Sequence, residues 1–436
     1  MPVFTSSIEV TADYPTIKPS LNLNFARSRA LDPRITFTRA SVGTYVGSDG
    51  LIKTASNNEP RFDHDPDTLE SLGLLIENIR TNYVNHYLVN SGNGWATSQE
   101  IIFSSTTEPA PDGSSNNQKM AATTTAGVSH STYKQVTGTT AGTVHTFSVY
   151  MKSAGSDYGY IYVDTAGGRY GGVAVQFSTG NTAVMTANGI GTQTDTSVTA
   201  VGNGWYRLSV SGSFSSTTQH YCHIDVGNDL SFSTFAGNGT DGIYVWGAQL
   251  ENGSFPTSII PTSGSLATRE RDDATIVGES FNSFYNQNEG SLFVESTPRY
   301  LASGINHRVC VISGDSDFTI SSAPGGINVD YAGTTLRTEL FSGSPNSAQA
   351  GTGLTVSAGN KNKLAYGLET NNVSVIVNGT QVGTTDTSAS MPDPMTKMGI
   401  GRRPDTSSTY ADGIHVSSIQ YYTKRFTNAQ LQLLTS

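Results

Sequence analysis

Short stretches in which apolar and polar residues alternate recur along most of this chain. Leu21, Leu23 and Phe25 alternate with asparagines in "LNLNFA", and the stretch "VHTFSVYM" ending at Met151 has the same pattern. A period of two places successive side chains on opposite faces of a pleated strand. Turn-forming Gly, Asn, Asp and Ser separate these stretches, so the sequence predicts an all-β protein made of many short strands.

Dipeptides with strong turn preferences predict where neighbouring strands form hairpins. Asp49-Gly50 lies between "TYV" and "LI", and Asn378-Gly379 joins the two alternating runs of "VSVIVNGTQVG". Both dipeptides tolerate the positive φ angles that two-residue hairpin turns require. Asp65-Pro66-Asp67 predicts a further turn between "EPRF" and "LGLLIE".

One helix is predicted, at the end of the sequence. Thr427 and Gln430 have the spacing of a capping box, and Phe426 before the cap can pack against Leu431. Leu431 and Leu434 are three residues apart and share a helix face. We expect this short helix to lie on a sheet.

Changes in pattern divide the chain into five predicted segments. The first is polar and rich in proline, and the fourth is rich in small and charged residues, including Arg269, Arg271, Asp272 and Asp273. The second is too small for independent stability, so we expect it to serve attachment or oligomerisation. The segments are an extended arm (1–20), a small β module (21–82), a jelly-roll region (83–261), a linker (262–275) and a second β region (276–436).

The composition limits the partners and the compartment. Charged residues make up 14% of the chain and the net charge is −10, which disfavours nucleic acid and anionic membranes as partners. No apolar run is long enough for a membrane helix, and the first residues lack the pattern of a signal peptide. We therefore expect that the protein is made in a cytoplasm and does not insert into a membrane. Cys222 and Cys310 are the two cysteines, which leaves no disulfide framework, and we expect both to be buried.

Several motifs carry a resemblance to a known group of proteins. "TFTRAS", "DGLI", "EPRFDHD" and "GLLIENIRTN", within residues 31–82, resemble the opening module of bacteriophage virion proteins of the tail-fibre, head-fibre and spike type. "FSVYMKS", "GWYRLSVSGS" and "YVWGAQLENGSFPTSIIPT" are similar to that group's jelly roll, which resembles carbohydrate-binding modules. The C-terminal "ADGIHVSSIQYYTKRFTNAQLQLLT" is similar to its concanavalin-like (LamG-type) β-sandwich.

The resemblance implies a decoration or appendage subunit on the exterior surface of a virion. It implies homotrimers and attachment to other virion proteins, such as the capsid, portal or tail, through the N-terminal region. It also implies binding to cell-surface glycans in host adhesion.

Aromatic and charged residues supply the candidate glycan sites. Trp246 lies in the strand Ile243–Leu250, and its alternation with Ala248 and Leu250 predicts a core position. Trp205 follows a turn and Trp95 lies in a loop, so each is a candidate for stacking on a sugar, with packing at the rim or end of the sandwich as the alternative. A long loop before the last strand supplies further glycan candidates, with a plain surface loop as the alternative: Arg402, Arg403, Tyr410 and Asp412.

Metal and catalytic motifs are sparse. Asp63, Asp65 and Asp67 alternate like the start of a calcium loop, but Thr68 replaces the turn glycine and Leu74 the final glutamate. A hairpin turn capped by the aspartates is the alternative to Ca²⁺, and no other cofactor is expected. The common hydrolase, metalloprotease and phosphate-loop motifs are absent from the sequence.

The pattern as a whole favours a non-enzymatic virion protein that binds glycans weakly through many copies. A purely structural assembly or adaptor protein without a ligand is the main alternative. A polysaccharide depolymerase is the third hypothesis, since paired carboxylates could be assembled from distant positions.

Overall fold

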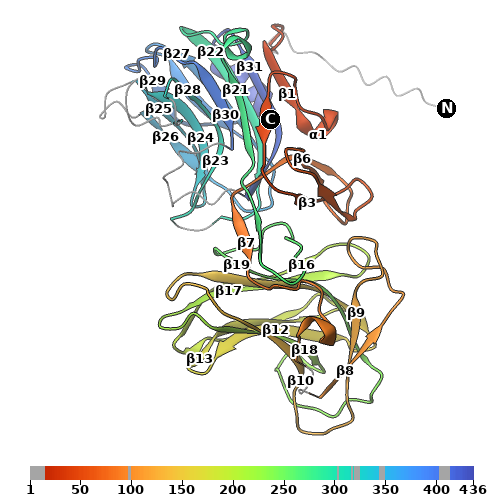
Figure 1. The fold of residues 1–436 in the computed structure, drawn as a ribbon. Coiled ribbons are helices and arrows are strands. Elements are labelled where there is room, and N and C mark those ends of the chain that lie inside the picture. The colour runs from red at the N-terminus through yellow and green to blue at the C-terminus, as the bar shows by residue number, and fades with distance from the viewer. Residues whose placement is uncertain are drawn as a thin grey trace, which may run out of the picture. The chain divides into compact units, whose positions relative to one another are not determined.

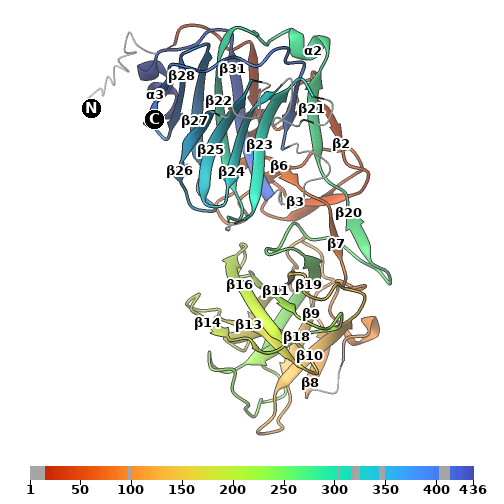
Figure 2. The ribbon, with the colours of Figure 1, turned by 90° about the vertical axis from the view of Figure 1, so that its left-hand side faces the viewer.

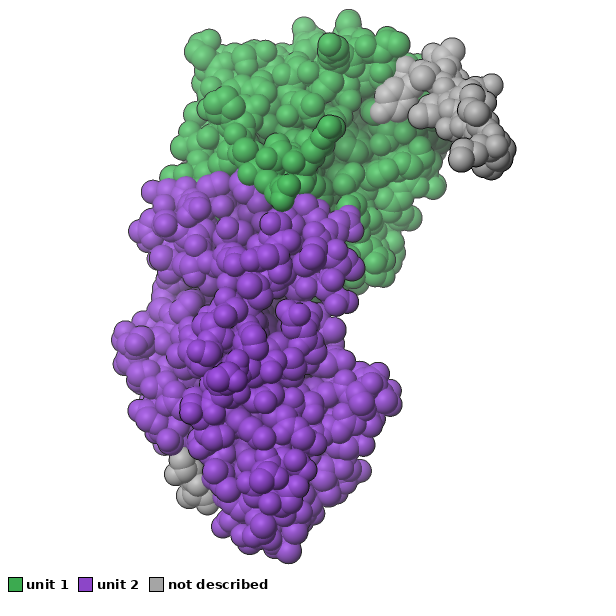
Figure 3. Space-filling view, turned by 90° about the vertical axis from the view of Figure 1, so that its right-hand side faces the viewer, with its two compact units in different colours: residues 1–38, 72–78, 272–436 green, residues 39–71, 79–271 purple. Residues whose placement is uncertain are grey.

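The computed structural model describes residues 15–96, 100–301, 304–315, 318, 325–342, 349–401 and 413–436. The chain folds into two compact units, coloured separately in Figure 3. Unit 1 comprises Met1–Thr38, Leu72–Asn78 and Asp272–Ser436, and unit 2 comprises Arg39–Ser71 and Ile79–Arg271. Antiparallel strands dominate both units, which confirms the all-β prediction.

Unit 1 is a sandwich of two antiparallel sheets, seen as two layers in Figure 2. One sheet has the order β29-β28-β27-β22-β31-β6, with β1 also paired to β31: β1 (Leu21–Asn24), β6 (Ser71–Glu77), β22 (Glu289–Pro298), β27 (Asn362–Glu369), β28 (Val373–Val377), β29 (Thr380–Asp386) and β31 (Gly413–Tyr422). The other has the order β2-β21-β30-β23-β24-β25-β26: β2 (Thr36–Thr38), β21 (Asp273–Val277), β23 (Asn306–Ser313), β24 (Gly326–Ala332), β25 (Thr335–Phe341), β26 (Gln349–Thr355) and β30 (Lys397–Ile400).

Three helices belong to unit 1: α1 (Phe25–Ser28), α2 (Glu279–Asn282) and α3 (Asn428–Thr435). In α3 the Thr427 hydroxyl accepts from the Gln430 amide at 3.2 Å, and the Gln430 side chain accepts from the Thr427 amide at 3.0 Å. Phe426 and Leu431 pack in one cluster with Ala365 of β27 and Ile376 of β28. The predicted capping box and the docking of this helix on a sheet are confirmed.

The predicted hairpin turns adopt the expected backbone conformations. Asn378 and Gly379 have φ angles of 49° and 77° between β28 and β29, as a type I′ turn requires. Gly50, with φ 75°, lies between β3 (Gly43–Val46) and β4 (Ile52–Ala55). Local sequence therefore determines both turns.

Unit 2 contains a second sandwich (Figure 1). Its first sheet has the order β10-β18-β12-β13-β14, with β15 paired to β13: β10 (His130–Val136), β12 (Tyr158–Thr165), β13 (Gly168–Gln176), β14 (Thr182–Met185), β15 (Asn188–Gly189) and β18 (His220–Gly227). Its second sheet has the order β16-β17-β11-β19-β9-β8: β8 (Ile101–Ser105), β9 (Gln118–Ala122), β11 (His145–Ala154), β16 (Gly191–Ala200), β17 (Tyr206–Phe214) and β19 (Gly242–Asn252). Shorter elements complete the unit: β5 (Phe62–His64), η1 (Ser91–Asn93), and the pair β7 (Arg80–Asn82) and β20 (Ala267–Arg269).

The core of unit 2 lies between its two sheets and contains both aliphatic and aromatic side chains. Val149 of β11, Ile161 of β12, Leu208 of β17 and Ile224 of β18 are all fully buried in it. Cys222 lies in the same core, and Cys310 is buried in unit 1, as predicted.

A bulge in β19 changes which side chains share a face. The β11–β19 register shifts between Ser148 and Tyr150, and Gly247 opposite has a φ of 69°. Trp246 therefore packs on the outer side of the sheet, whereas Ala248 and Leu250 point into the core. The prediction that these three residues share one face is wrong, because a bulge reverses the alternation that a regular strand would keep.

The units differ from the segments predicted from sequence. Residues 21–82 are divided between them, and the portion 39–71 belongs to unit 2. There the Arg61 guanidinium donates to the Thr44 carbonyl at 2.9 Å and to the Ser258 hydroxyl at 2.8 Å, and the Thr44 hydroxyl donates to the Ile259 carbonyl at 2.6 Å. The predicted linker 262–275 contains β20 and the start of β21, and Arg269 and Asp272 within it are buried rather than solvated.

Among the helices that the structure describes, none has the length and apolar character needed to cross a membrane.

Candidate functional site

The tryptophans predicted to stack on sugars are buried. Trp95 is 2% exposed within the core of unit 2, and Trp205, also 2% exposed, packs beside Trp246 and Tyr150. The indole N–H of Trp205 donates to the Pro109 carbonyl at 3.1 Å. Neither ring face can meet a ligand, so the glycan-site prediction for Trp95 and Trp205 is corrected in favour of packing. Trp246, 1% exposed, is a core residue as predicted.

Two of the three aspartates proposed for calcium, Asp63 and Asp65, accept hydrogen bonds from backbone amides instead. Asp63 accepts from the Val46 amide at 2.6 Å, and Asp65 accepts from the amides of Asp67 and Thr68 at 2.9 and 2.8 Å. Within the described ranges no three His, Cys, Asp or Glu side chains are grouped to hold a metal ion. The capped hairpin turn, the alternative to a calcium loop, accounts for these contacts. The remaining candidates, Arg402, Arg403, Tyr410 and Asp412, lie outside the described residues.

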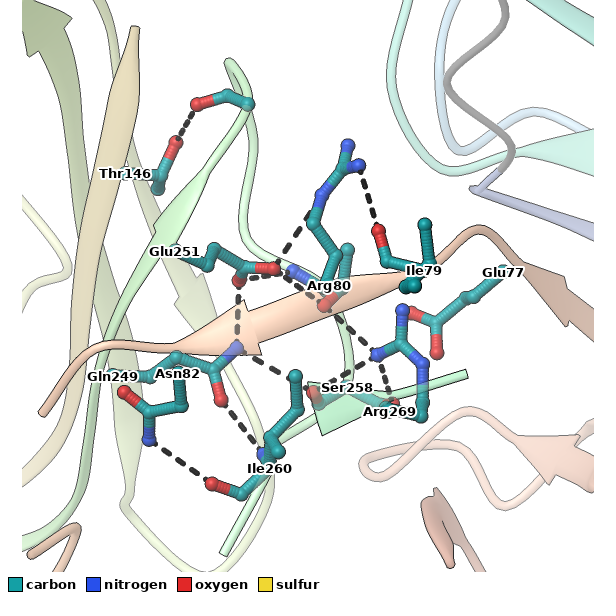
Figure 4. Close-up of polar contacts among 12 residues, drawn as sticks. Glu77, Ile79, Arg80, Asn82, Thr146, Gln249, Glu251, Ser258, Ile260 and Arg269 are labelled. Atoms are coloured by element: carbon teal, nitrogen blue, oxygen red, sulfur yellow. Dashed lines mark hydrogen bonds and ion pairs between the residues drawn. The ribbon is translucent and has the colours of Figure 1, made fainter. Parts of the chain in front are cut away.

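A buried polar network lies against the outer side of the sheet that contains β19 (Figure 4). Glu251 is fully buried and accepts from the Gln249 amide group at 2.6 Å and from the Thr257 backbone amide and hydroxyl at 2.8 and 2.6 Å. The Nε atom of Arg80 lies 3.7 Å from the Glu251 carboxylate. These contacts hold the segment after β19 against the sheet.

Arginines surround the Thr257-Ser258 pair in the same network. Arg207 donates to the Thr257 carbonyl at 2.7 Å, Arg269 donates to the hydroxyls of Thr257 and Ser258, and Arg61 donates to the Ser258 hydroxyl. This explains the motif "NGSFPTSIIPT": its polar residues provide hydrogen-bond partners for buried guanidinium groups. Most polar groups of this network are buried and hydrogen bonded within it, although the Nε atoms of Arg80 and Arg207 have no hydrogen-bond partner. We interpret the network as structural.

The outer side of the other sheet of unit 2 carries aromatic side chains, which we call the aromatic face. They alternate with core residues on three adjacent strands and form a connected set of ring contacts. The His223 ring stacks on Tyr162 with centroids 4.2 Å apart, and Tyr133 lies 5.2 Å from His223 and 5.6 Å from Tyr221. The aromatic face consists of Tyr133 of β10, Tyr160 and Tyr162 of β12, and Tyr221 and His223 of β18.

Two acids lie among these rings. Asp164, whose side chain is 37% exposed, lies 3.1 Å from the Nε2 atom of His223. Asp225 is 1% exposed, and it pairs across the strands with Tyr160, whose hydroxyl is hydrogen bonded to its carboxylate. The Oδ1 atom of Asp225 has no hydrogen-bond partner, and burial raises the pKa of this carboxyl well above its usual range.

A hollow adjoins the aromatic face beyond the start of β12. Its volume is about 320 Å³, and Tyr158 and Gly227 at the strand ends line it. A Cβ atom at Gly227 would lie 3.1 Å or less from both Tyr158 and Tyr160, so the glycine lets these rings lie close to the sheet. The other side chains in the lining are both polar and apolar: Ser156, Asp157, Asn228, Asn238 and Asp241, with Ala122, Val226, Phe235 and Ala236.

The segment between β18 and β19 forms one wall of the hollow and also contacts the aromatic face. The Phe232 ring packs edge-on against Tyr160 with centroids 5.0 Å apart. Phe232 has a φ of 56°, a backbone conformation that bulky residues rarely adopt. This segment therefore places an aromatic ring beside Tyr160 at some cost in backbone strain.

The sequence contains a signal for the aromatic face. In "YGYIYVD" and "HYCHIDV" the outward positions of two alternating runs are tyrosine, histidine and aspartate instead of the usual Thr, Ser or Lys. Tryptophan positions alone do not indicate the aromatic face, because it contains no tryptophan. The pairing of β12 with β18 in register, which brings Tyr162 beside His223, is visible only in the structure.

No protein-family model matches this chain, and no curated protein matches it. Similar solved structures include a Trypanosoma rangeli sialidase in complex with 2,3-difluorosialic acid, at 15% identity and a TM-score of 0.29 over 38% of this chain. They also include the binding domain of botulinum neurotoxin serotype D/C, at 13% identity and a TM-score of 0.30 over 38% of this chain. Domain 4 of AbnA, an arabinanase from Geobacillus stearothermophilus, in complex with arabinotriose, has 14% identity and a TM-score of 0.27 over 42% of this chain.

These matches span 26% of the sialidase chain, 40% of the toxin chain and 82% of the arabinanase domain. They relate parts of this chain to parts of other β-rich proteins. We draw no conclusion about activity from similarities of this size.

Proposed function

We propose that this protein is a non-enzymatic glycan-binding protein and that unit 2 binds the glycan on its aromatic face and in the adjoining hollow. The observation that carries the proposal is the combination of partly exposed ring surfaces with the Asp164 carboxylate beside His223 on one side of a sheet. Aromatic rings stack on the apolar faces of sugars, and carboxylates accept hydrogen bonds from their hydroxyls.

The proposed site favours weak binding by each copy. Tyr133, Tyr162 and Tyr221 are only partly exposed and the hollow is small, so each contact with a sugar is limited in area. Display in many copies raises the total strength of attachment by orders of magnitude without new contacts. The proposal therefore includes a repetitive carrier.

We propose the exterior of a bacteriophage virion as that carrier, with the protein as a fibre, spike or decoration subunit. The motifs in residues 31–82 support this placement by their resemblance to virion proteins. Homotrimers and attachment to capsid, portal or tail proteins belong to the same proposal. Light scattering coupled to size exclusion at micromolar concentration tests the assembly: we expect a trimer, and a monomer would contradict it.

A glycan array tests binding directly, with the full chain and two matched variants. We expect Tyr162→Ala to weaken binding about tenfold through the loss of one stacking ring. Tyr45→Ala, which removes a partly exposed tyrosine of the β3–β4 hairpin in the same unit, is the control and should bind like the wild type. Equal losses in both variants would contradict the assignment of the site.

A purely structural role is the second candidate, and the burial of all three tryptophans favours it. Under this hypothesis the wild-type chain binds nothing on arrays of bacterial polysaccharides. Release of soluble oligosaccharide from host envelopes would instead support an enzyme, and loss of that release on replacement of one acid would identify the catalytic group.

A further inference from the structure

We infer that the glycan bound by unit 2 is uncharged, and that the carboxylates around the aromatic face and the hollow exclude acidic glycans. This inference rests on the proposed function and adds the class of ligand. It follows from the charges of the described side chains on these strands and on the segment 228–241.

Acidic side chains lie at both ends of the proposed site. Asp164 lies at the end of β12 beside His223, and Asp157 and Asp241 line the hollow. Asp229 follows β18, close enough to interact electrostatically with the Tyr160 hydroxyl. An extended glycan lying across the rings would therefore have carboxylates near each of its ends.

Two of these acids are held in the charged form. Burial opposes ionisation of Asp157, but hydrogen bonds from Ser178 and Gln176 lower its pKa below the usual value. Burial likewise opposes ionisation of Asp229, and hydrogen bonds from Ser233 and Ser231 lower its pKa. Both groups are negative at neutral pH.

Basic side chains on the same strands balance these charges only in part. Arg169 of β13 pairs across the strands with Asp164 and acts electrostatically on Tyr162, and its guanidinium donates to the Thr186 carbonyl at 3.1 Å. Lys134 of β10 alternates with Tyr133 and so points to the opposite side of the sheet, where its ammonium donates to the Asn93 carbonyl. The described part of the site thus has an excess of negative charge.

Asp164 adds a positive requirement to this exclusion. Its side chain is 37% exposed beside His223, so its oxygens can accept hydrogen bonds from sugar hydroxyls. A sulfate or carboxylate on the ligand brings only acceptors and a repelling charge. An uncharged, hydroxyl-rich ligand satisfies both conditions.

Paired glycans test the inference. The wild-type chain is assayed against neutral oligosaccharides from the array and against the sulfated and sialylated derivatives of the same oligosaccharides. In 50 mM NaCl we expect the acidic member of each pair to bind at least about tenfold more weakly, a difference of about 1.4 kcal/mol. In 1 M NaCl, where screening acts over about 3 Å, we expect the ratio to fall to about threefold or less.

Variants assign the effect to the acids. Asp164→Asn combined with Asp229→Asn keeps the acceptor oxygens and removes two charges, so we expect the acidic derivatives to bind closer to the neutral ones. Asp49→Asn removes a charge from the β3–β4 turn of the same unit and should leave the ratio unchanged. If the double variant folds poorly, the salt dependence of the wild type decides alone.

The outcomes separate the two proposals. Acidic derivatives that bind as well as or better than their neutral partners at low salt would overturn this inference and leave glycan binding intact. A ratio that does not depend on salt would overturn the electrostatic explanation. Failure of every glycan to bind would overturn the proposed function itself.

Discussion

The two sheets of unit 2 use aromatic residues in opposite ways. On the outer side of the sheet that contains β11, β17 and β19, Trp205 and Trp246 are covered, and the neighbouring Glu251 has several hydrogen-bond donors. On the outer side of the other sheet, tyrosines remain partly exposed and Asp225 has a carboxylate oxygen without a partner.

This comparison shows that the type of aromatic residue does not identify a binding surface. Tryptophan is the residue that sequence reasoning favours for sugars, yet here each indole is part of the packing. The exposure of the rings is more informative, because a ring that is covered by other side chains cannot contact a ligand.

The largest effect on stability is expected on the outer side of the sheet that contains β19, where the aromatic residues are covered. Glu251→Ala leaves the buried Arg80 and Thr257 without their acceptor, so we expect a loss of about 3–5 kcal/mol in the free energy of unfolding of unit 2. Urea unfolding followed by tryptophan fluorescence reports on this unit, since all three tryptophans lie in it. Asp164→Ala, on the aromatic face, should change the free energy of unfolding by less than about 0.5 kcal/mol. Similar losses in the two variants would remove the distinction between the sheets.

Removal of one ring from each side compares packing with binding. Trp246→Ala should cost about 3 kcal/mol or more in stability, because it leaves a cavity between Tyr150 and Tyr87. Tyr162→Ala should cost about 1 kcal/mol and should mainly reduce glycan binding. Urea unfolding and glycan binding are measured on both proteins. A Trp246 variant that is stable but no longer binds glycan would contradict this comparison. It would indicate that the tryptophans form the binding site.

A buried histidine between the two sheets, His220, should make the stability of unit 2 sensitive to acid. Burial, followed by the neighbouring His145, lowers the pKa of His220 to about 3. The unfolded chain therefore takes up this proton first as pH falls below about 6.5, and stability is lost at up to about 1.4 kcal/mol per pH unit. At pH 5 we expect a loss of about 2 kcal/mol relative to pH 7. His220→Phe should show a smaller change, and an equal change in both proteins would contradict the assignment.

The smallest expected effect is a gain, not a loss, in the free energy of unfolding. Because burial raises the pKa of Asp225, the unfolded chain loses this proton at lower pH than the folded one, and the group destabilises the fold as pH rises above about 4. We expect Asp225→Asn to increase the free energy of unfolding by about 1 kcal/mol at pH 7, measured by urea unfolding. A variant that is less stable than the wild type at pH 7 would contradict the raised pKa.

The sequence by itself determined the elements whose physical cause is local. Asn378, Gly379 and Gly50 make their turns because these residues tolerate positive φ, and Thr427 with Gln430 caps the last helix. Alternation identified β1, β11 and β19 and hence the all-β class. The burial of Cys222 followed from the absence of a disulfide framework.

The tertiary structure alone decided how these elements combine. The bulge at Gly247 moved Trp246 to the outer side of its sheet, and the hydrogen bonds of Arg61 placed the segment 39–71 in unit 2. Strand pairing brought Tyr162, His223 and Asp225 to one surface from positions up to 63 residues apart in sequence. Such contacts depend on register and on long-range packing, which a pattern of period two does not encode.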